Sequence, residues 1–252
     1  MKASIIIPTY NQSPQFLRAA LMSAKYQTMP CEIIIVDDGS RPMQSSVVES
    51  VMSGYTNEKK EFGVAAKYVW QENAGVAGAL NRGIKESTGD VIQWLPSDDV
   101  YVLCKTADQI KMIDRYPDCR ASYCSYEDGI PQVSSVWPAV QHATKEKLLE
   151  CLCKRCFINA ATVMFKRELI DEVGFFDLSY RHAQDYEFLL RLAQATNFAA
   201  IDRVLVRRRV HAGQMSQTLV QDEEREAKKD ELKRLNEKYG STAALWTPDG
   251  RQ

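Results

Sequence analysis

The sequence predicts an α/β fold of three layers, with helices on both sides of a mostly parallel sheet. Short apolar strands alternate with amphipathic helices through roughly the first hundred residues, and repeated units of this kind build parallel sheets. Ser4–Ile7 and Glu32–Val36 contain continuous apolar runs, which are typical of strands covered on both faces. A chain of 252 residues is long enough to bury a sizeable core.

The elements of the first half follow one another closely. Ser13 and Pro14 supply an N-cap and a first-turn proline, so we expect a helix there with Leu17, Leu21 and Ala24 as its apolar stripe. The further elements expected are a strand over Glu32–Val36, a strand over Ala66–Trp70, a helix over Gly75–Glu86 and a strand over Val91–Leu95, which Pro96 ends.

The second half is less regular. We expect helices over Lys105–Tyr116, Lys145–Cys151 and Gln184–Ala195, and strands near Ala121–Tyr123, Ala161–Phe165 and Arg203–Arg209. The densely charged segment from Val220 to Tyr239 predicts a last helix that docks through a narrow stripe of Leu232, Leu235 and Tyr239.

Charge and hydropathy narrow the class of protein. The 32 basic and 33 acidic residues nearly cancel, so the net charge favours neither nucleic acid nor an anionic membrane as a partner. No apolar leader opens the chain, and no run approaches the eighteen or so apolar residues of a spanning helix. We therefore expect a cytoplasmic protein without a transmembrane segment, which could still contact the inner face of a membrane peripherally.

The seven cysteines are an odd number, so they cannot all pair within one chain. Cys151, Cys153 and Cys156 are spaced in a way that raises the question of a metal site. Structural zinc usually takes four ligands, and no fourth cysteine or histidine follows at zinc-finger spacing. We interpret these three as buried or incidental thiols.

Polar residues follow three of the predicted strands at the point where each ends. In parallel sheets ligands bind beyond the carboxyl ends of the strands, so these residues should converge. The adjacent carboxylates Asp98 and Asp99 repel each other, and a divalent ion that bridges to phosphate oxygens would relieve that repulsion. The alternative is a solvated helix N-terminus, where aspartate stabilises free N–H groups. The three polar segments are Thr9–Asn11, Asp37–Ser40 and Ser97–Asp99.

Five motifs, in order and spacing, resemble glycosyltransferase family 2, and the resemblance covers about residues 3 to 217. They are Ser4–Asn11, Val36–Ser40, Asn73–Gly75 with Asn81–Gly83, Gly89–Asp90 and Pro96–Asp99. Three later segments fit the family's acceptor half, namely Gly174–Asp177, Gln184–Tyr186 and His211–Ser216.

The resemblance implies a GT-A fold over residues 1–217, with a nucleotide-binding half (1–104), an acceptor half (105–217) and a charged helical tail (218–252). It implies inverting transfer of a sugar from a nucleotide-diphosphate donor, with a UDP-sugar favoured, assisted by Mn²⁺ or Mg²⁺. The acceptor would be a hydroxyl of a carbohydrate or lipid-linked carbohydrate, and the usual setting is the synthesis of surface polysaccharide or glycoconjugates.

The same resemblance assigns donor-binding roles by position. Pro8 and Tyr10 would border the nucleotide base, and Asp38 would accept a hydrogen bond from a uracil-type imide N–H. For Asp37 and Asp38 the alternative is a local Asx-type turn closed by Gly39. Three further residues, Asn73, Gly75 and Arg82, would line the nucleotide and diphosphate, although Arg82 could equally be a solvated helix residue.

The reacting end of the donor would meet a second group of residues. Ser97 occupies the first position of the motif often written D-x-D, Asp98 would contact the ribose or donor sugar, and Asp99 would bind the metal. His211 could join the metal, since neutral imidazole suits manganese, or it could be structural. The arginines before it, Arg207–Arg209, could help hold phosphate, although strand alternation would turn only some of them toward the site.

Asp185 is the candidate base that removes the acceptor proton. It matches the second position of the family's acidic pair, although Gln184 replaces the more frequent acidic neighbour. The alternative is that Asp185 only stabilises the first turn of its helix.

Two other functions compete. A nucleotidyltransferase would need a glycine-rich phosphate loop after the first strand, and Pro8–Asn11 does not provide one. A binding module that has lost catalysis would not be expected to keep Asp99, Asp185 and His211 together.

Overall fold

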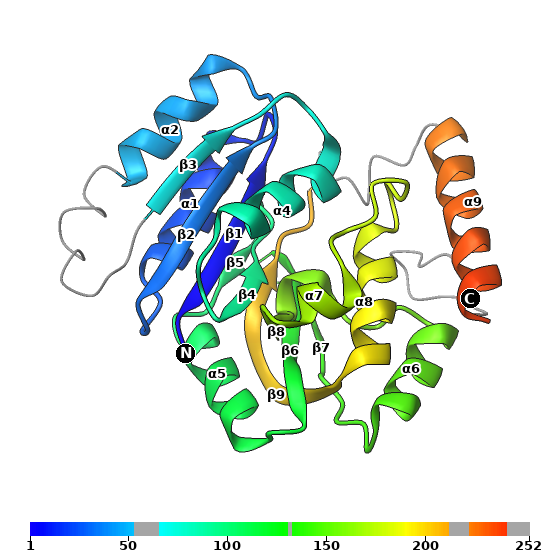
Figure 1. The fold of residues 1–252 in the computed structure, drawn as a ribbon. Coiled ribbons are helices and arrows are strands. Elements are labelled where there is room, and N and C mark those ends of the chain that lie inside the picture. The colour runs from blue at the N-terminus through cyan, green and yellow to red at the C-terminus, as the bar shows by residue number, and fades with distance from the viewer. Residues whose placement is uncertain (53–65, 131–132, 212–221, 241–252) are drawn as a thin grey trace.

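The computed structural model describes residues 1–52, 66–130, 133–211 and 222–240 (Figure 1). In chain order the elements are β1 (Ala3–Thr9), α1 (Pro14–Lys25), β2 (Cys31–Asp37), α2 (Pro42–Met52), β3 (Ala66–Trp70), α4 (Gly75–Glu86), β4 (Val91–Trp94), β5 (Val100–Tyr101), α5 (Lys105–Arg115), β6 (Cys119–Ile130), β7 (Val133–Trp137), α6 (Lys145–Lys154), the 3-10 turn η2 (Ala160–Thr162), β8 (Met164–Lys166), α7 (Leu169–Val173), α8 (Gln184–Ala195), β9 (Asn197–Arg208) and α9 (Asp222–Tyr239).

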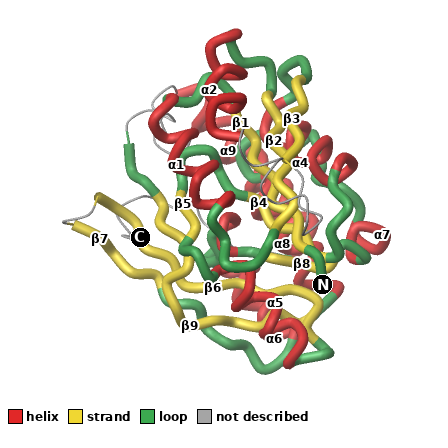
Figure 2. Tube along the Cα trace, turned by 90° about the vertical axis from the view of Figure 1, so that its left-hand side faces the viewer, coloured by secondary structure: helices red, strands yellow, loops and turns green. Residues whose placement is uncertain are grey.

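One sheet runs through the molecule in the order β3-β2-β1-β4-β8-β6-β9-β5, with β7 paired to β6. The strands β3, β2, β1 and β4 are parallel, which confirms the α/β fold and the parallel arrangement expected for the first half. The second half is mixed, because β8 runs antiparallel to both β4 and β6 while β9 runs parallel to β6. The regular alternation of strands and helices, which predicts parallel strands, also ends where the first half of the sequence ends. Figure 2 shows β6 and β7 as an arm that projects at one side.

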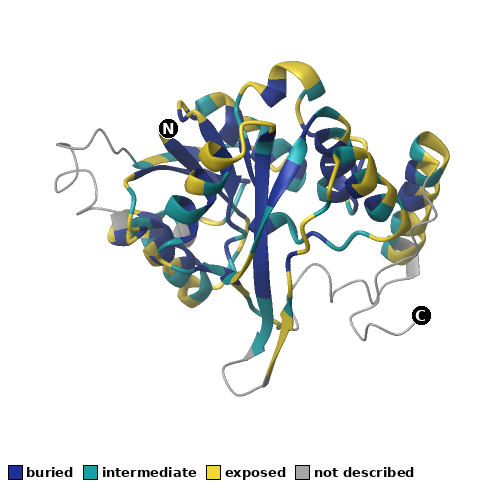
Figure 3. Cartoon of the chain, turned by 90° about the horizontal axis from the view of Figure 1, so that it is seen from below, coloured by how far each residue is buried: buried dark blue, intermediate teal, exposed yellow. Residues whose placement is uncertain are grey.

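The apolar strands are buried on both faces, as their continuous runs predict. Along β1, Ile5 and Ile7 belong to one core cluster, while Ile6 between them belongs to the other. Residues of α1 and α5 contribute to the first cluster, and residues of α4 and α8 to the second. The sheet is therefore the middle of three layers, and exposed residues gather on the outer faces of the helices (Figure 3).

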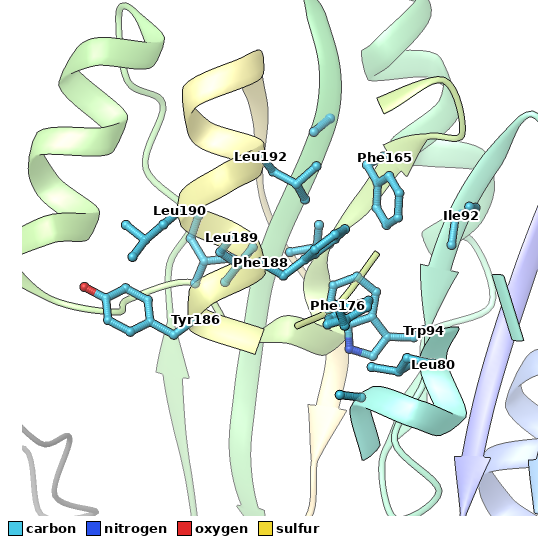
Figure 4. Packing of buried hydrophobic residues seen from close by; sticks show 14 of the residues in the cluster. Leu80, Ile92, Trp94, Phe165, Phe176, Tyr186, Phe188, Leu189, Leu190 and Leu192 are labelled. Atoms are coloured by element: carbon cyan, nitrogen blue, oxygen red, sulfur yellow. The ribbon is translucent and has the colours of Figure 1, made fainter. Parts of the chain in front are cut away.

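An aromatic cluster fixes α8 against the strands that carry the carboxylates (Figure 4). The Trp94 ring, at the end of β4, meets Phe176 edge-on at 5.6 Å between centroids, and Phe176 stacks on Phe188 of α8 at 4.1 Å. Trp94 and Phe188 are 3% and 0% exposed, so this contact is part of the packed core. The start of α8 is thereby held close to the end of β4.

Two expected strands differ from the structure. Ala161–Phe165 begins as a 3-10 turn and not as a strand, because the Asn159 side chain accepts a hydrogen bond from Ala161 N and its carbonyl accepts one from Thr162 N. The strand expected over Arg203–Arg209 starts earlier, at Asn197, since the segment pairs along β6. Four further elements, α2, β5, β7 and α7, were not expected from the sequence.

The tail forms the helix α9, which lies beside α8 at the edge of the molecule (Figure 1). Leu232 and Leu235 are buried in the same cluster as α8, and Tyr239 packs against that cluster, so the predicted stripe is the docking face. The other residues assigned to the tail, 218–221 and 241–252, lie outside the described residues. Among the helices that the structure describes, none is long and apolar enough to cross a membrane.

Candidate active site

A cavity of about 570 Å³ opens beyond the carboxyl ends of β1 and β4 and beside the first turn of α8. Its wall brings together residues from both halves of the chain and from the tail helix. Seven residues that the sequence analysis assigned to the site line it: Pro8, Tyr10, Asp38, Ser97, Asp98, Asp99 and Asp185.

The turn after β2 uses its two aspartates differently. Asp37 accepts hydrogen bonds from Ser40 N at 2.8 Å and from the Tyr68 hydroxyl at 2.7 Å, so it closes the Asx-type turn. Asp38 lines the cavity, and its Oδ1 accepts from Gln71 Nε2 at 2.7 Å and from Ala74 N at 2.8 Å. Asp37 thus fits the turn interpretation, while the contact of Asp38 with a nucleotide stays a prediction.

Gly39 allows the turn to approach the chain after β3. Its φ of 86° lies in the left-handed region that favours glycine, and an added Cβ would lie 3.1 Å from Asn73 N. Asn73 Nδ2 in turn donates to the Asp38 carbonyl at 3.0 Å. The loop before α4 thus supports the Asp38 carboxylate.

Three of the residues expected at the nucleotide do not line the cavity. Asn73 supports the Asp38 turn, and Gly75 begins α4 with a φ of 76°. Arg82 forms an ion pair with Glu86 at 2.8 Å, and its side chain is 47% exposed. This agrees with the alternative that Arg82 is a solvated helix residue. Contacts of these three with a nucleotide stay predictions.

The segment after β4 holds the two adjacent carboxylates in different surroundings. Asp99 is 2% exposed and accepts a hydrogen bond from Arg209 N at 3.1 Å. Burial first, and then the charge of Asp98, raise the pKa of Asp99 well above its ordinary value. His211 Nε2 lies 3.1 Å from Asp98 Oδ2, so the histidine contacts Asp98 and not the predicted metal ligand Asp99.

The donor set suits a divalent cation in its chemistry but is incomplete on its own. Two carboxylates and an imidazole are ligands that manganese accepts, and the imidazole of His211 lies 3.1 Å from Asp98. In the described part of the chain, no three histidine, cysteine or acidic side chains are arranged to hold an ion. Any ion here would need further oxygens, such as those of a diphosphate. The segment after His211, residues 212–216, lies outside the described residues.

Asp185 lies in the first turn of α8 and in the cavity wall. Its Oδ1 accepts a hydrogen bond from Tyr186 N at 2.8 Å, and burial raises its pKa. Gln184 beside it is 8% exposed, and its Oε1 has no hydrogen-bond partner among the described residues. Thr9 Oγ1, at the end of β1, is buried and unpartnered in the same way. Both residues line the cavity, so a bound hydroxyl or water would satisfy them.

Arg208 and Lys228 also line the cavity. Arg208, one of the arginines expected to help hold phosphate, pairs with Asp128, whereas Lys228 of α9 was not expected there from the sequence. Strand alternation explains the arginine: Arg208 faces the cavity, while its neighbour Arg207 pairs with Glu127 and is largely exposed. No local signal marks Lys228, since only the docking of α9 brings it there.

The three clustered cysteines do not form a common site. Cys153 and Cys156 direct their thiols to different backbone carbonyls, those of Tyr239 and Ile158. Cys156 lines the cavity, and burial raises the pKa of its thiol. All three cysteines are partly buried, which agrees with the interpretation as incidental thiols.

The comparisons with known proteins agree with this architecture. The sequence model of Glycosyl transferase family 2 matches residues 4–174. An uncharacterized glycosyltransferase of Rickettsia prowazekii is 33% identical over 222 residues, which are 85% of this chain and 66% of that protein. The chain belongs to glycosyltransferase family 2. It spans about two thirds of that relative and only 35% of a similar protein of Rickettsia felis.

Solved structures share the fold at low sequence identity. S. aureus TarS 1-349 in complex with UDP-GlcNAc superposes with a TM-score of 0.72 at 20% identity, covering 98% of this chain and 68% of that one. The mannosyltransferase PcManGT of Pyrobaculum calidifontis, in complex with GDP-Man and Mn²⁺, gives a TM-score of 0.61 at 20% identity, covering 85% and 58%. The fold is GT-A.

Proposed function

We propose that this protein transfers a sugar from a nucleotide-diphosphate donor to an acceptor hydroxyl with inversion. The observation that carries the proposal is the meeting of four carboxylates from three segments in one cavity: Asp38 after β2, Asp98 and Asp99 after β4, and Asp185 at the start of α8. They come from positions far apart in the chain, and only the fold unites them. Membership of glycosyltransferase family 2 supports the same conclusion.

The donor nucleotide would lie along the ends of β1 and β2. Pro8 and the half-exposed ring of Tyr10 border this part of the cavity, and Asp38 offers a fixed carboxylate to an imide N–H. The uracil ring carries such a donor, so we favour a UDP-sugar. The structure of S. aureus TarS in complex with UDP-GlcNAc supports this choice. The mannosyltransferase PcManGT is in complex with GDP-Man, so the identity of the donor base has to be tested.

Asp98 and Asp99, with His211 against Asp98, would hold a divalent ion, Mn²⁺ or Mg²⁺, together with diphosphate oxygens. Such an ion would neutralise negative charge on the diphosphate leaving group. Support comes from the Mn²⁺ in the mannosyltransferase complex and from the adjacency of two carboxylates in the cavity wall. Ser97 lies beside them, and its hydroxyl is within 3.3 Å of Gln12 Nε2.

Asp185 would remove the proton from the acceptor hydroxyl. A carboxylate whose pKa is raised by burial is a stronger base than a solvated one, and its position in the cavity wall gives it access to substrate. Gln184 Oε1 beside it, which has no hydrogen-bond partner among the described residues, could accept a hydrogen bond from another acceptor hydroxyl. These features favour a carbohydrate or lipid-linked carbohydrate acceptor, and a role in polysaccharide or glycoconjugate synthesis rests on the family resemblance.

A thermal-shift panel tests the donor assignment. We expect a UDP-sugar to raise the melting temperature, and manganese to increase that shift, because both ligands bind only the folded state. GDP- and dTDP-sugars serve as matched alternatives. If none of these nucleotides stabilises the protein, the proposed function fails. Stabilisation without turnover on any acceptor would favour the non-catalytic binding module.

A further inference from the structure

The segment that leads into α8 is held by a single carboxylate of the tail helix. Glu231 Oε1 accepts a hydrogen bond from Arg181 N at 2.7 Å, and Oε2 accepts from His182 N at 2.8 Å and from Ala183 N at 2.9 Å. Three consecutive backbone N–H groups thus converge on one side chain, which is only 5% exposed. Hydrogen bonds to an ionised acceptor are among the strongest that a protein makes.

This carboxylate holds the backbone that leads into α8, and its described hydrogen bonds are to residues before the first turn. The residue at the N-cap, Ala183, has no side chain able to accept a hydrogen bond, although free N–H groups and the positive end of the helix dipole are present there. Glu231 is 48 residues away from Ala183 in the sequence, and it adds a carboxylate at this end of the helix to those of Asp185 and Glu187 in the first turn. Asp185 follows two residues after Ala183.

Other contacts fix α9 to the same region. Leu235 is 0% exposed in the core cluster, and Arg234 Nη2 donates to the Ser179 carbonyl at 3.0 Å while its guanidinium lies over the Tyr180 ring. The Tyr239 hydroxyl donates to Glu187 Oε1 of α8 at 3.1 Å. Lys228, one turn before Glu231, lines the cavity itself. The helix therefore reaches both α8 and the site.

We propose that Glu231 is a positioning residue of the transferase, which sets the place of the Asp185 carboxylate by holding residues 181–183. The inference rests on the proposed role of Asp185 as base. The hydrogen bond described for Asp185 is to its neighbour Tyr186, so its location follows that of the first turn. An error of about 1 Å in a catalytic group can cost on the order of a hundredfold in rate. The tail helix is then part of the catalytic unit.

Kinetics of Glu231→Gln test the proposal in the full chain, with Asp230→Asn as the matched control. Asp230 is the exposed neighbour on the same helix. Glu231→Gln keeps the size of the side chain but gives the three N–H groups only one carbonyl acceptor. We expect kcat to fall about tenfold or more, with the donor Kd within twofold of wild type, and Asp230→Asn to match wild type. Glu231→Asp, which keeps the charge, should lie between the two, and it takes the place of Glu231→Gln if that variant does not fold.

A double variant separates positioning from general stability. If Glu231 acts through Asp185, Glu231→Gln should cost nothing further in an Asp185→Asn background, because the group that it positions is already disabled. Losses that multiply in the double variant, or a kcat within twofold of wild type in Glu231→Gln, would overturn the proposal.

Hydrogen exchange gives a measurement that does not depend on turnover. The amides of residues 181–183 should be protected in the wild type and should exchange at least about tenfold faster in Glu231→Gln, while those of α4 stay unchanged. Unchanged exchange at residues 181–183 would refute the positioning role, whether or not the protein is a transferase. Faster exchange together with an inactive wild type would instead place the failure in the proposed function.

Discussion

Lys105, at the start of α5, is a buried cation whose ionisation should oppose folding. It is 0% exposed, and its Nζ donates to Gln93 Oε1 at 2.8 Å and to Gln109 Oε1 at 2.6 Å. Nζ also lies 4.1 Å from the centroid of the Tyr101 ring. These partners are neutral, so they compensate only part of the lost hydration, and burial lowers the pKa of Lys105 from 10.5 to about 8.

The sign of the resulting pH dependence follows from proton binding. Between about pH 8 and 10.5 the unfolded chain keeps the Lys105 proton while the folded chain has released it. The unfolded state then binds more protons, so this group makes the free energy of unfolding rise with pH in that window. Over the whole window the contribution of Lys105 to the free energy of unfolding would change by ~3 kcal/mol, and ~2 kcal/mol of this change falls between about pH 7.5 and 9.5.

Urea unfolding of the wild type and of Lys105→Met at about pH 7.5 and 9.5 measures this contribution. Methionine has a similar shape but does not titrate, and comparing the two proteins cancels the ionisation of groups that do not interact with Lys105. We expect the stability of the wild type relative to Lys105→Met to increase by ~2 kcal/mol at the higher pH. A relative stability that is constant or falls would refute the reasoning.

Three further substitutions test the packing and the nucleotide site. Gly83→Ala should lower the free energy of unfolding, measured in urea, by ~1–3 kcal/mol, because the added Cβ would lie 2.3 Å from Ile6 Cγ2 where α4 crosses β1. An unchanged midpoint of urea unfolding would contradict that packing. Leu235→Ala should cost ~2–5 kcal/mol if α9 is docked as part of the core, whereas a loss below about 0.5 kcal/mol would mean a loosely attached tail. Asp38→Ala should weaken UDP binding about tenfold or more in calorimetry, because the imide N–H would lose a charged acceptor, and wild-type affinity would remove Asp38 from the base contact.

The part of the site that lies at strand ends could be predicted from the sequence alone. Asp38 and the pair Asp98–Asp99 each follow an apolar run that is typical of a buried strand, and the ends of parallel strands meet at one edge of a sheet, so their convergence was expected. Asp185 could be assigned only because Gln184–Tyr186 resembles a motif of the family at the start of a helix. The elements missed were those with little local signal, such as β5 with its two residues.

What the sequence could not show depends on contacts between distant segments. Nothing near Glu231 or Lys228 distinguishes them from the other charges of the tail, and only the burial of Leu232 and Leu235 turns them toward α8. The contact of His211 with Asp98 likewise depends on how the chain leaves β9. The mixed half of the sheet follows from pairing of β8 with both β4 and β6, which periodicity within a strand does not encode.

The role of Asp185 is the central claim, and one substitution tests it most directly. Asp185→Asn keeps the shape of the side chain but removes its ability to take a proton. With the donor Kd unchanged in calorimetry, we expect transfer to the acceptor to fall by roughly 10²–10⁴-fold, the usual contribution of a general base. Turnover close to that of the wild type, with donor binding intact, would contradict the assignment of Asp185 and the mechanism that depends on it.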